Sequence, residues 1–225
     1  MATTFQRARS EEQRAQRRQA ILDTAAAMLT EMPVAQLSLN ELSRRVGLAK
    51  SNVLRYFESR EAVLLELLDA AAGEWLDGLD AELTAAVDPA GGPRERGDTV
   101  AAAIASSLAA RPVLCDLVGA QAAVLERNVS AEIAAQYKRA AVAGALRFAG
   151  MIADRVPELG EADALRFAGV TLMVTGTVWT HTQPSAAMLA AYQADPELAA
   201  MRPDFTDTMR QTLEVLLSGL LARGD

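Results

Sequence analysis

Apolar residues recur at helical spacing along most of the chain. The first run spans about residues 12 to 32, stops at Pro33 and contains the apolar positions Ile21, Leu22, Ala25, Ala26 and Leu29. Positions three, four and seven apart lie on one side of an α-helix, so this run predicts an amphipathic first helix. Proline lacks the backbone N–H that helix continuation needs, which predicts the end of the helix near residue 32.

A second, shorter run follows in the segment "SLNELSRRVG", residues 38–47. Ser38 and Glu41 have the spacing of a capping box at a helix N-terminus. Gly47 stands where a helix ends in a left-handed residue, and the next residue, Leu48, can fold back on Leu42. The pattern therefore predicts a short helix that closes in a tight turn.

A third helix is predicted at about residues 50–57, directly after this turn. At about 100° per residue its positions divide into two arcs. The inward arc is predicted to contain Val53, Leu54 and Phe57. The outward arc contains Ser51, Asn52, Arg55 and Tyr56. A short helix presented in this way after a tight turn has the geometry of a helix-turn-helix.

The rest of the chain also shows helical patterns, with few aromatic and β-branched residues to favour strands. A fourth helix is predicted from the cap Ser59 to about Val87, followed by the loop "DPAGGPRERGD" at 88–98. Further helices are predicted at about 99–110, 112–126, 131–156, 161–182, 185–193 and 205–222. The predicted fold class is all-α: a three-helix domain with a helix-turn-helix, then a larger helical domain.

The outward side chains of the third helix suit a DNA major groove. Asparagine can pair bidentately with adenine and arginine with guanine, while hydroxyl and ammonium groups reach phosphates or base edges. The candidate DNA-binding residues are Ser38, Lys50, Ser51, Asn52, Arg55, Tyr56 and Arg60. An ordinary solvated helix face is the alternative for any isolated stretch of this length. The preceding helix, the Gly47 turn and the local charge favour DNA.

Charge is unevenly divided along the chain. The net charge is −7, with +4 in residues 1–60 and −11 in the remainder, so only the N-terminal part is suited to a polyanion. The first 19 residues include five arginines together with Glu11 and Glu12. Such an arm enters a minor groove or contacts phosphates in some proteins and is a disordered or helical solvated tail in others. The sequence leaves both readings open.

Residues 14–64 resemble the DNA-binding domain of the TetR family of bacterial transcriptional regulators. The likeness lies in "ILDTAAAML", "LSLNELSRRVGLAKSNVLRYF" and "ESREAVL". It implies an all-helical homodimer that binds a palindromic double-stranded DNA operator and a small-molecule effector that releases it. The expected division is a flexible arm at 1–13, a DNA-binding domain at 14–65 and a ligand-binding and dimerisation domain at 66–225.

Two further sites are expected in the larger domain. A specific DNA site needs two recognition helices about one DNA turn apart, which calls for a two-fold axis. Helices 161–182 and 205–222 are the candidate interface; one has Gly169 and Gly176, and the other has the stripe Met209, Leu213, Leu216, Leu217, Leu220 and Leu221. Core packing within one chain explains the same stripe. The candidate effector-pocket residues are Cys115, Gln121, Tyr137, Arg147, Met173, Thr177 and Trp179.

Other function classes are disfavoured. One Cys and one His cannot supply a thiolate or imidazole zinc site, and no phosphate-binding loop or nucleophile motif is present, so we expect no metal, no cofactor and no enzymatic activity. An all-α enzyme and a non-specific DNA-binding protein are the alternatives; the acidic body argues against the second. With no secretory signal or long apolar run, we expect a cytoplasmic protein that does not enter a membrane.

Overall fold

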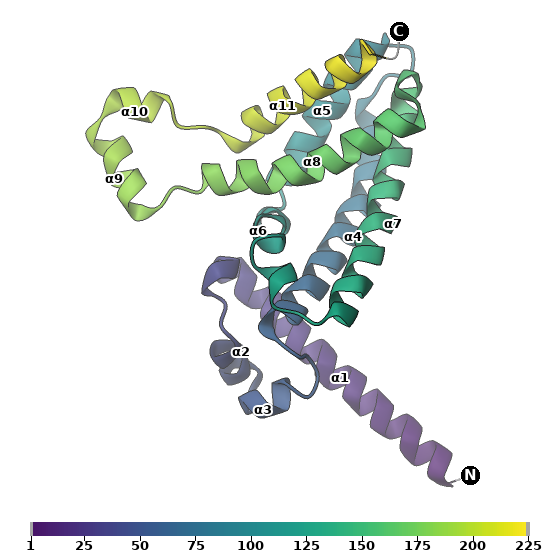
Figure 1. Ribbon diagram of the computed structural model, residues 1–225, viewed down its shortest axis with the longest axis vertical. Coiled ribbons are helices and arrows are strands. Elements are labelled where there is room, and N and C mark those ends of the chain that lie inside the picture. The colour runs from purple at the N-terminus through teal and green to yellow at the C-terminus, as the bar shows by residue number, and fades with distance from the viewer. Residues whose placement is uncertain (1, 224–225) are drawn as a thin grey trace. The chain divides into compact units, whose positions relative to one another are not determined.

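The computed structural model describes residues 2–223, with side chains from residue 11 onward, and contains no strand within that range. The chain forms two compact units. The N-terminal unit holds the chain up to Leu67 together with Ala120–Ala135, and the C-terminal unit holds Leu68–Gly119 and the chain from Gln136 onward. Figure 1 shows the helices of both units. The all-α prediction is therefore confirmed.

The N-terminal unit contains the first three helices and the beginning of the fourth. Their bounds are α1 Ala2–Glu31, α2 Leu39–Val46, α3 Lys50–Val53 and α4 Arg60–Ala86, with a short 3-10 turn, η1, at Val34–Gln36. Ile21, Ala25 and Met28 of α1 are completely buried, as is Leu42 of α2. The apolar stripe of the first helix thus forms the core against which α2 packs.

Helix α1 is longer than its apolar pattern predicts. It begins at Ala2, whereas the periodic apolar positions predict a start near residue 12. The segment expected to be a flexible arm, residues 1–13, is therefore helical from residue 2 to residue 13, and whether it contacts DNA stays open. Hydrophobic periodicity could not find this part because every residue from Glu11 to Arg17 is exposed and has no core to face.

The C-terminal unit contains the rest of α4 and most of the remaining helices. The bounds are α5 Pro93–Ala109, α6 Pro112–Gln121, α7 Ala131–Arg155, α8 Gly160–Thr182, α9 Ala186–Ala194, α10 Pro196–Ala200 and α11 Phe205–Leu221. Two 3-10 turns, η2 and η3, lie at Leu125–Arg127 and Pro157–Leu159. Helix α11 packs along α5 and α8 (Figure 1).

Two prolines that were expected to interrupt helices lie instead at helix starts. Pro93 lies in the predicted loop 88–98 but is the first residue of α5, and Pro196 is the first residue of α10, which was not predicted. At the first helical position the missing N–H costs nothing, and the fixed φ suits the helix. Asp195 also caps α10, because its carboxylate accepts hydrogen bonds from Glu197 N and Leu198 N.

The core of the C-terminal unit is built around aromatic and polar contacts between distant helices. Trp75 of α4 lies 5.2 Å, centroid to centroid, from Phe148 of α7, which lies 6.5 Å from Phe167 of α8. The Trp75 indole N–H donates to Ser107 Oγ of α5 at 3.1 Å. Arg96 of α5 is buried and donates to the carbonyl of Arg155 and to the carboxylate of Glu158. These contacts hold α4, α5, α7 and α8 in one unit.

The apolar stripe of the last helix packs inside the chain. Met209, Leu213, Leu217 and Leu220 are at most 5% exposed, and α11 packs mainly on α5. Core packing within one chain therefore explains these four residues, whereas Leu216 and Leu221 of the expected stripe are half-buried. The expected dimer interface on α8 and α11 stays a prediction. The stripe was ambiguous because burial against a neighbouring helix and burial against a partner subunit need the same apolar periodicity.

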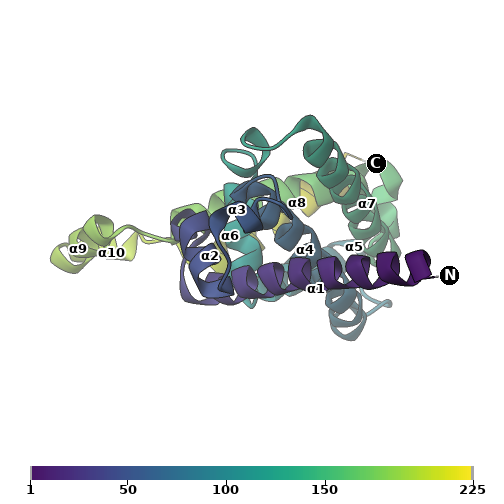
Figure 2. The same cartoon turned by 90° about the horizontal axis from the view of Figure 1, so that it is seen from below.

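Helices α9 and α10 stand away from the other helices of the C-terminal unit (Figures 1 and 2). Their main packing partners are each other. Several large apolar side chains of this pair are exposed: Met188, Leu189, Leu198 and Met201.

Helices α6 and α8 cross with glycine on both sides of the contact. A Cβ built on Gly176 of α8 would lie 3.0 Å from Gly119 Cα and 3.1 Å from the Val118 carbonyl oxygen of α6. Gly169, the other glycine expected to allow close helix approach, has no such neighbour within 4 Å. The close approach is therefore made at Gly176, and it lies inside one chain.

We predict that Gly176→Ala lowers the free energy of unfolding by about 1–3 kcal/mol, because the added methyl group pushes two backbones apart. Chemical denaturation at fixed protein concentration measures this change. Gly150→Ala is the matched control: Gly150 lies in α7, is exposed and has open space around its Cβ position. That substitution is expected to raise stability by up to about 1 kcal/mol through helix propensity. Equal effects of the two substitutions would contradict the close crossing.

Candidate nucleic-acid interface

The turn between α2 and α3 forms as the sequence predicts. Ser38 caps α2, its Oγ accepting a hydrogen bond from Glu41 N at 3.2 Å. Gly47 has φ +74°, and Leu48 N donates to the Ser43 carbonyl oxygen at 3.0 Å. A residue with a Cβ is strained at such a positive φ, so glycine allows the chain to turn sharply into α3. The turn fixes the direction in which α3 leaves α2.

The second half of the predicted capping box takes a different form. The Glu41 carboxylate accepts hydrogen bonds from Arg44 at 2.8 and 2.6 Å and from Arg45 at 3.0 Å. These two guanidinium groups hold the pKa of Glu41 down at about 2. Glu41 therefore stays ionised at neutral pH and neutralises charge on α2. The Ser38 hydroxyl serves as a helix cap, and its contact with DNA stays a prediction.

Helix α3 is shorter than predicted, and one of its expected buried residues is exposed. Val53 and Phe57 are buried, but Leu54 is 41% exposed, so its assignment to the inward arc is wrong. The α-helix ends at Val53, and residues 54–56 form turns. Arg55 N and Tyr56 N bond to carbonyls three residues back, on Asn52 and Val53. The tighter winding begins after Leu54, because Leu54 N still bonds four residues back to the Lys50 carbonyl at 3.0 Å. Leu54 lies about 100° around the helix from the buried Val53 and faces solvent.

The outward side of α3 presents polar side chains to solvent. Lys50, Ser51, Asn52 and Arg55 are exposed, and Tyr56 is half-buried. Within the described part of the chain, the side chains of the first four make no hydrogen bond or salt bridge. Their donors and acceptors are therefore available to another molecule. The structure brings these five candidates together on one side of the turn.

Arg60 differs from the other candidates because its guanidinium is used inside the protein. Its Nη2 donates to the Val34 carbonyl oxygen at 2.5 Å, and its Nη1 lies 3.2 Å from the Glu61 carboxylate. The side chain is only 20% exposed. Arg60 therefore ties the start of α4 to the η1 turn, and its contact with DNA stays a prediction. Its charge suggested a phosphate contact, but sequence alone could not show the backbone carbonyl that it binds.

A groove beside α3 includes residues that the candidate set omits. It has a volume of about 460 Å³ and is lined by Gln13, Arg14, Arg17, Leu48, Asn52, Arg55 and Tyr56. The first three belong to α1, where Arg14 and Arg17 are one helical turn apart. That spacing was visible in the sequence, but the position of α1 against α3 was not.

The effector-pocket candidates lie in dissimilar surroundings. Cys115 is buried, its Sγ 3.3 Å from the Leu108 carbonyl oxygen, and burial raises the pKa of its thiol to about 12. Tyr137 is also buried, whereas Gln121 is half-buried and donates to Glu126. Trp179 packs edge-on against Phe205, with ring centroids 5.4 Å apart.

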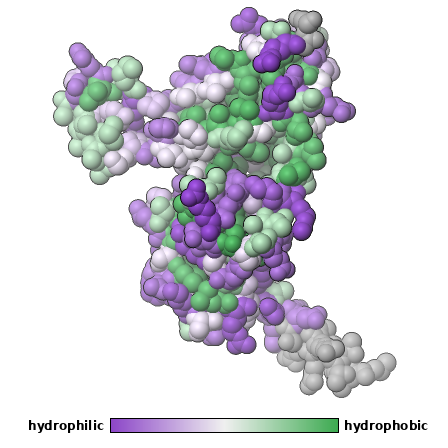
Figure 3. Space-filling model, in the orientation of Figure 1, coloured by the Kyte–Doolittle hydropathy of each residue, from purple (hydrophilic) through white to green (hydrophobic). Residues whose placement is uncertain are grey.

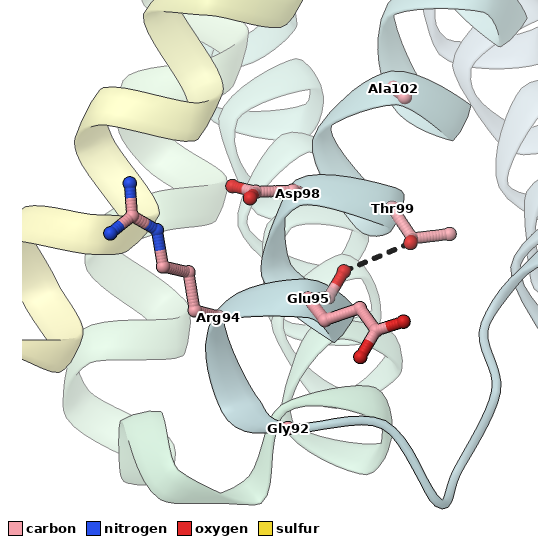
Figure 4. Close-up of a pocket in the computed structure, with 6 residues that line it drawn as sticks. All are labelled: Gly92, Arg94, Glu95, Asp98, Thr99 and Ala102. Atoms are coloured by element: carbon pink, nitrogen blue, oxygen red, sulfur yellow. Dashed lines mark hydrogen bonds between the residues drawn. The ribbon is translucent and has the colours of Figure 1, made fainter.

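The other three candidates lie on the surface. Met173 is 67% exposed, Thr177 is exposed, and Arg147 is exposed and pairs with Asp77 at 2.7 Å. A shallow hollow of about 710 Å³ lies elsewhere, along the first turns of α5, and is lined by Gly92, Arg94, Glu95, Asp98, Thr99 and Ala102 (Figure 4). It lies along a single helix and contains none of the candidates. The effector pocket therefore stays a prediction.

We predict that Arg60→Ala lowers the free energy of unfolding by about 1–3 kcal/mol, because the Val34 carbonyl and the Glu61 carboxylate lose a half-buried donor. Denaturant titration measures the loss. The control is Arg44→Ala, which removes an arginine whose side chain is 71% exposed and paired with Glu41. An exposed pair contributes about 0–1 kcal/mol. If Arg60→Ala costs no more than Arg44→Ala, the structural role of Arg60 is contradicted.

Comparison with known proteins agrees with this architecture. Residues 21–67 match the family described as bacterial regulatory proteins, tetR family, and residues 69–224 match the tetracyclin repressor-like C-terminal domain. The HTH-type transcriptional regulator EthR of Mycobacterium tuberculosis is 40% identical over 55 residues, which are 24% of this chain and 26% of EthR. The match to this curated relative thus spans about a quarter of its length.

Solved structures share the fold over most of the chain. A TetR transcriptional regulator from Rhodococcus sp. RHA1 has a TM-score of 0.51 at 17% identity and covers 90% of this chain and 96% of its own. The regulator FadR from Bacillus subtilis, solved in complex with stearoyl-CoA, has a TM-score of 0.55 at 16% identity, with 89% and 98% covered. The two family matches together cover nearly the whole chain, so this protein belongs to the TetR family of bacterial transcriptional regulators.

Proposed function

We propose that the protein is a repressor that binds a palindromic DNA operator as a homodimer and leaves it when a small-molecule effector binds the C-terminal unit. The observation that carries this proposal is the outward side of α3. Ser51, Asn52 and Arg55 are exposed there, and their side chains have no partner within the described residues. In this proposal the protein acts in the cytoplasm, where its operator DNA lies.

The side chains on α3 supply the chemistry of base recognition. Asn52 can pair with the N6 and N7 atoms of adenine, and Arg55 with the O6 and N7 atoms of guanine. Lys50 at the start of α3 adds a positive charge for a backbone phosphate. Two kinds of base contact from one protomer define only a few base pairs, so a specific operator needs a second copy of α3.

Exposed apolar side chains in the C-terminal unit support a homodimer. Leu165 and Met173 of α8 are 41% and 67% exposed, and Val215 of α11 is 74% exposed. Val215 lies outside the buried stripe of α11, so each of the two helices has an exposed apolar side chain for a partner. We propose that α8 and α11 of two copies pack together through these residues, since a two-fold contact uses the same surface on both subunits.

Three helices offer routes for coupling the effector to DNA. The boundary between the two units falls inside α4, α6 and α7, at residues 67/68, 119/120 and 135/136. Within the N-terminal unit, the Ser130 N–H donates to the Glu58 carboxylate at 2.6 Å, directly after the turn that ends α3. We propose that an effector favours a conformation in which these helices, α4 above all, change the spacing of the two copies of α3.

DNA footprinting upstream of the gene tests the proposed operator. We predict protection of a palindrome at a stated salt concentration. Asn52→Ala and Arg55→Ala are each expected to cost about 1–3 kcal/mol of operator binding and to relax the preference at one base pair of each half-site. Protection of the same palindrome with unchanged base preference in both variants would contradict the assigned recognition side. Equal binding to unrelated DNA would favour the non-specific alternative.

A companion measurement tests release by an effector. A ligand that binds the native protein raises its thermal midpoint, so a thermal-shift screen identifies candidates, and the footprint is then repeated at saturation. Stearoyl-CoA, found in the solved FadR complex, serves as the first probe. If a ligand that raises the midpoint by binding the C-terminal unit leaves operator affinity unchanged, the release mechanism is contradicted for that ligand.

We predict that Met173→Glu with Val215→Glu converts the dimer to a monomer, because like charges would face each other across the two-fold axis. Sedimentation velocity measures the mass. Val142→Glu with Leu146→Glu is the matched control, because it places two acids on exposed apolar positions of α7, 52% and 55% exposed. If the Met173/Val215 variant remains a dimer and the Val142/Leu146 variant becomes a monomer, the interface lies on α7 instead.

A further inference from the structure

The cations of the N-terminal unit divide into two classes. One class is paired with carboxylates of the same unit. Arg18 pairs with Glu66, Arg45 with Glu31 and Glu41, Arg44 with Glu41, and Arg60 with Glu61. Each arginine of this class already has a carboxylate partner, which neutralises most of its charge.

The second class has no carboxylate partner within the described residues, and Arg14, Arg17 and Arg55 are three of its members, alongside the exposed Lys50 and Arg127. Within the described part of the chain, none of the three makes a salt bridge or a side-chain hydrogen bond. All three line the groove of about 460 Å³ beside α3, which also includes Asn52, and its lining contains no carboxylate. Three of the unpaired guanidinium groups are thus gathered in one place with a formal charge of +3.

The register of α1 explains why its two arginines face this groove. Arg17 and Ile21 are four residues apart, and Arg14 and Ile21 seven, so all three lie on one side of the helix. Ile21 is completely buried in the core, while Arg14 and Arg17, which lie closer to the N-terminus, are exposed. The side of α1 that is buried at Ile21 therefore carries exposed arginines where it passes the groove. Glu11 lies one turn before Arg14 and is exposed, outside the groove lining.

Three guanidinium groups around one groove repel one another when no anion is present. An anion that enters is attracted by all three, and arginine binds phosphate oxygens through paired N–H donors. Gln13 and Tyr56 add neutral donors to the lining. The groove thus has the charge and the donors for a single phosphate group, and it lies against the residues proposed to read bases.

We propose that Gln13, Arg14 and Arg17 form a site on α1 for one phosphate of the operator backbone, next to the bases read by Asn52 and Arg55. This inference rests on the proposed function. It makes α1 part of the DNA interface and gives α1 and α3 different roles in DNA binding. The arginines of α1 set affinity without regard to sequence, and the residues of α3 set the base preference.

The test compares the wild-type protein with Arg14→Ala/Arg17→Ala on the operator and on a scrambled duplex, over about 50 to 200 mM salt. A dimer that loses one phosphate contact per protomer is expected to lose about 2 from the slope of log affinity against log salt. Affinity should fall by a similar factor on both duplexes, with base preference unchanged. Arg14→Lys/Arg17→Lys should retain most of the slope, because lysine preserves the charge.

The matched control is Arg94→Ala/Arg202→Ala, which removes two exposed arginines from the C-terminal unit and should leave the slope unchanged. Thermal midpoints establish that each variant is folded. An unchanged slope in the Arg14/Arg17 variant would overturn the proposal, as would a loss confined to the operator. A wild-type protein that binds both duplexes equally would refute the proposed function, yet a lower slope in the variant would still establish the phosphate site.

A second arm separates DNA phosphate from a free anion. Inorganic phosphate is added at constant ionic strength, and the thermal midpoint and the DNA affinity are measured. Competition with DNA in the wild-type protein but not in the variant supports the proposal. If inorganic phosphate raises the midpoint of the wild-type protein alone while DNA binding is the same in both proteins, the groove is a free-anion site, and the DNA-backbone proposal fails.

Discussion

The proposed DNA-reading side of the protein depends on a helix too short to be stable by itself. Helix α3 has four residues, and a helix of one turn does not form in water without outside support. The support comes from burial of Val53 and Phe57 and from the left-handed turn at Gly47. Arg18 adds a third contact, with its guanidinium 4.5 Å from the Phe57 ring centroid. The packing of two side chains thus decides where Asn52 and Arg55 are presented.

Charge is organised by pairing rather than by abundance. The chain is acidic overall, and several arginines of the N-terminal unit are neutralised by nearby carboxylates such as Glu41 and Glu66. The unpaired cations include Arg14, Arg17 and Arg55, which line the groove beside α3. Figure 3 shows polar residues over much of the surface of this unit and larger apolar areas on the C-terminal unit. The two surfaces thus differ in polarity on this face of the molecule.

The C-terminal unit illustrates why an apolar stripe does not identify its partner. Leu213 and Leu217 of α11 are buried against α5, while Val215 on the same helix is exposed. Gly176 likewise meets Gly119 of its own chain. Helical periodicity indicates that a face is buried, but not whether it packs on its own chain or on a partner subunit. The resemblance pointed to α8 and α11 as a dimer interface, but four residues of the expected stripe on α11 are buried within the chain.

The sequence alone determined the helical class, the α2 cap at Ser38, the Gly47 turn and the outward position of Asn52 and Arg55, because each follows from local periodicity or backbone sterics. Tertiary structure decided what depends on distant partners. The Arg60 guanidinium binds the Val34 carbonyl, Leu54 is exposed, and Arg14 lines the groove because α1 lies beside α3. A charged or apolar side chain gives the same local sequence pattern whether it packs within the chain or faces a partner. Only its neighbours in the folded chain distinguish the two roles.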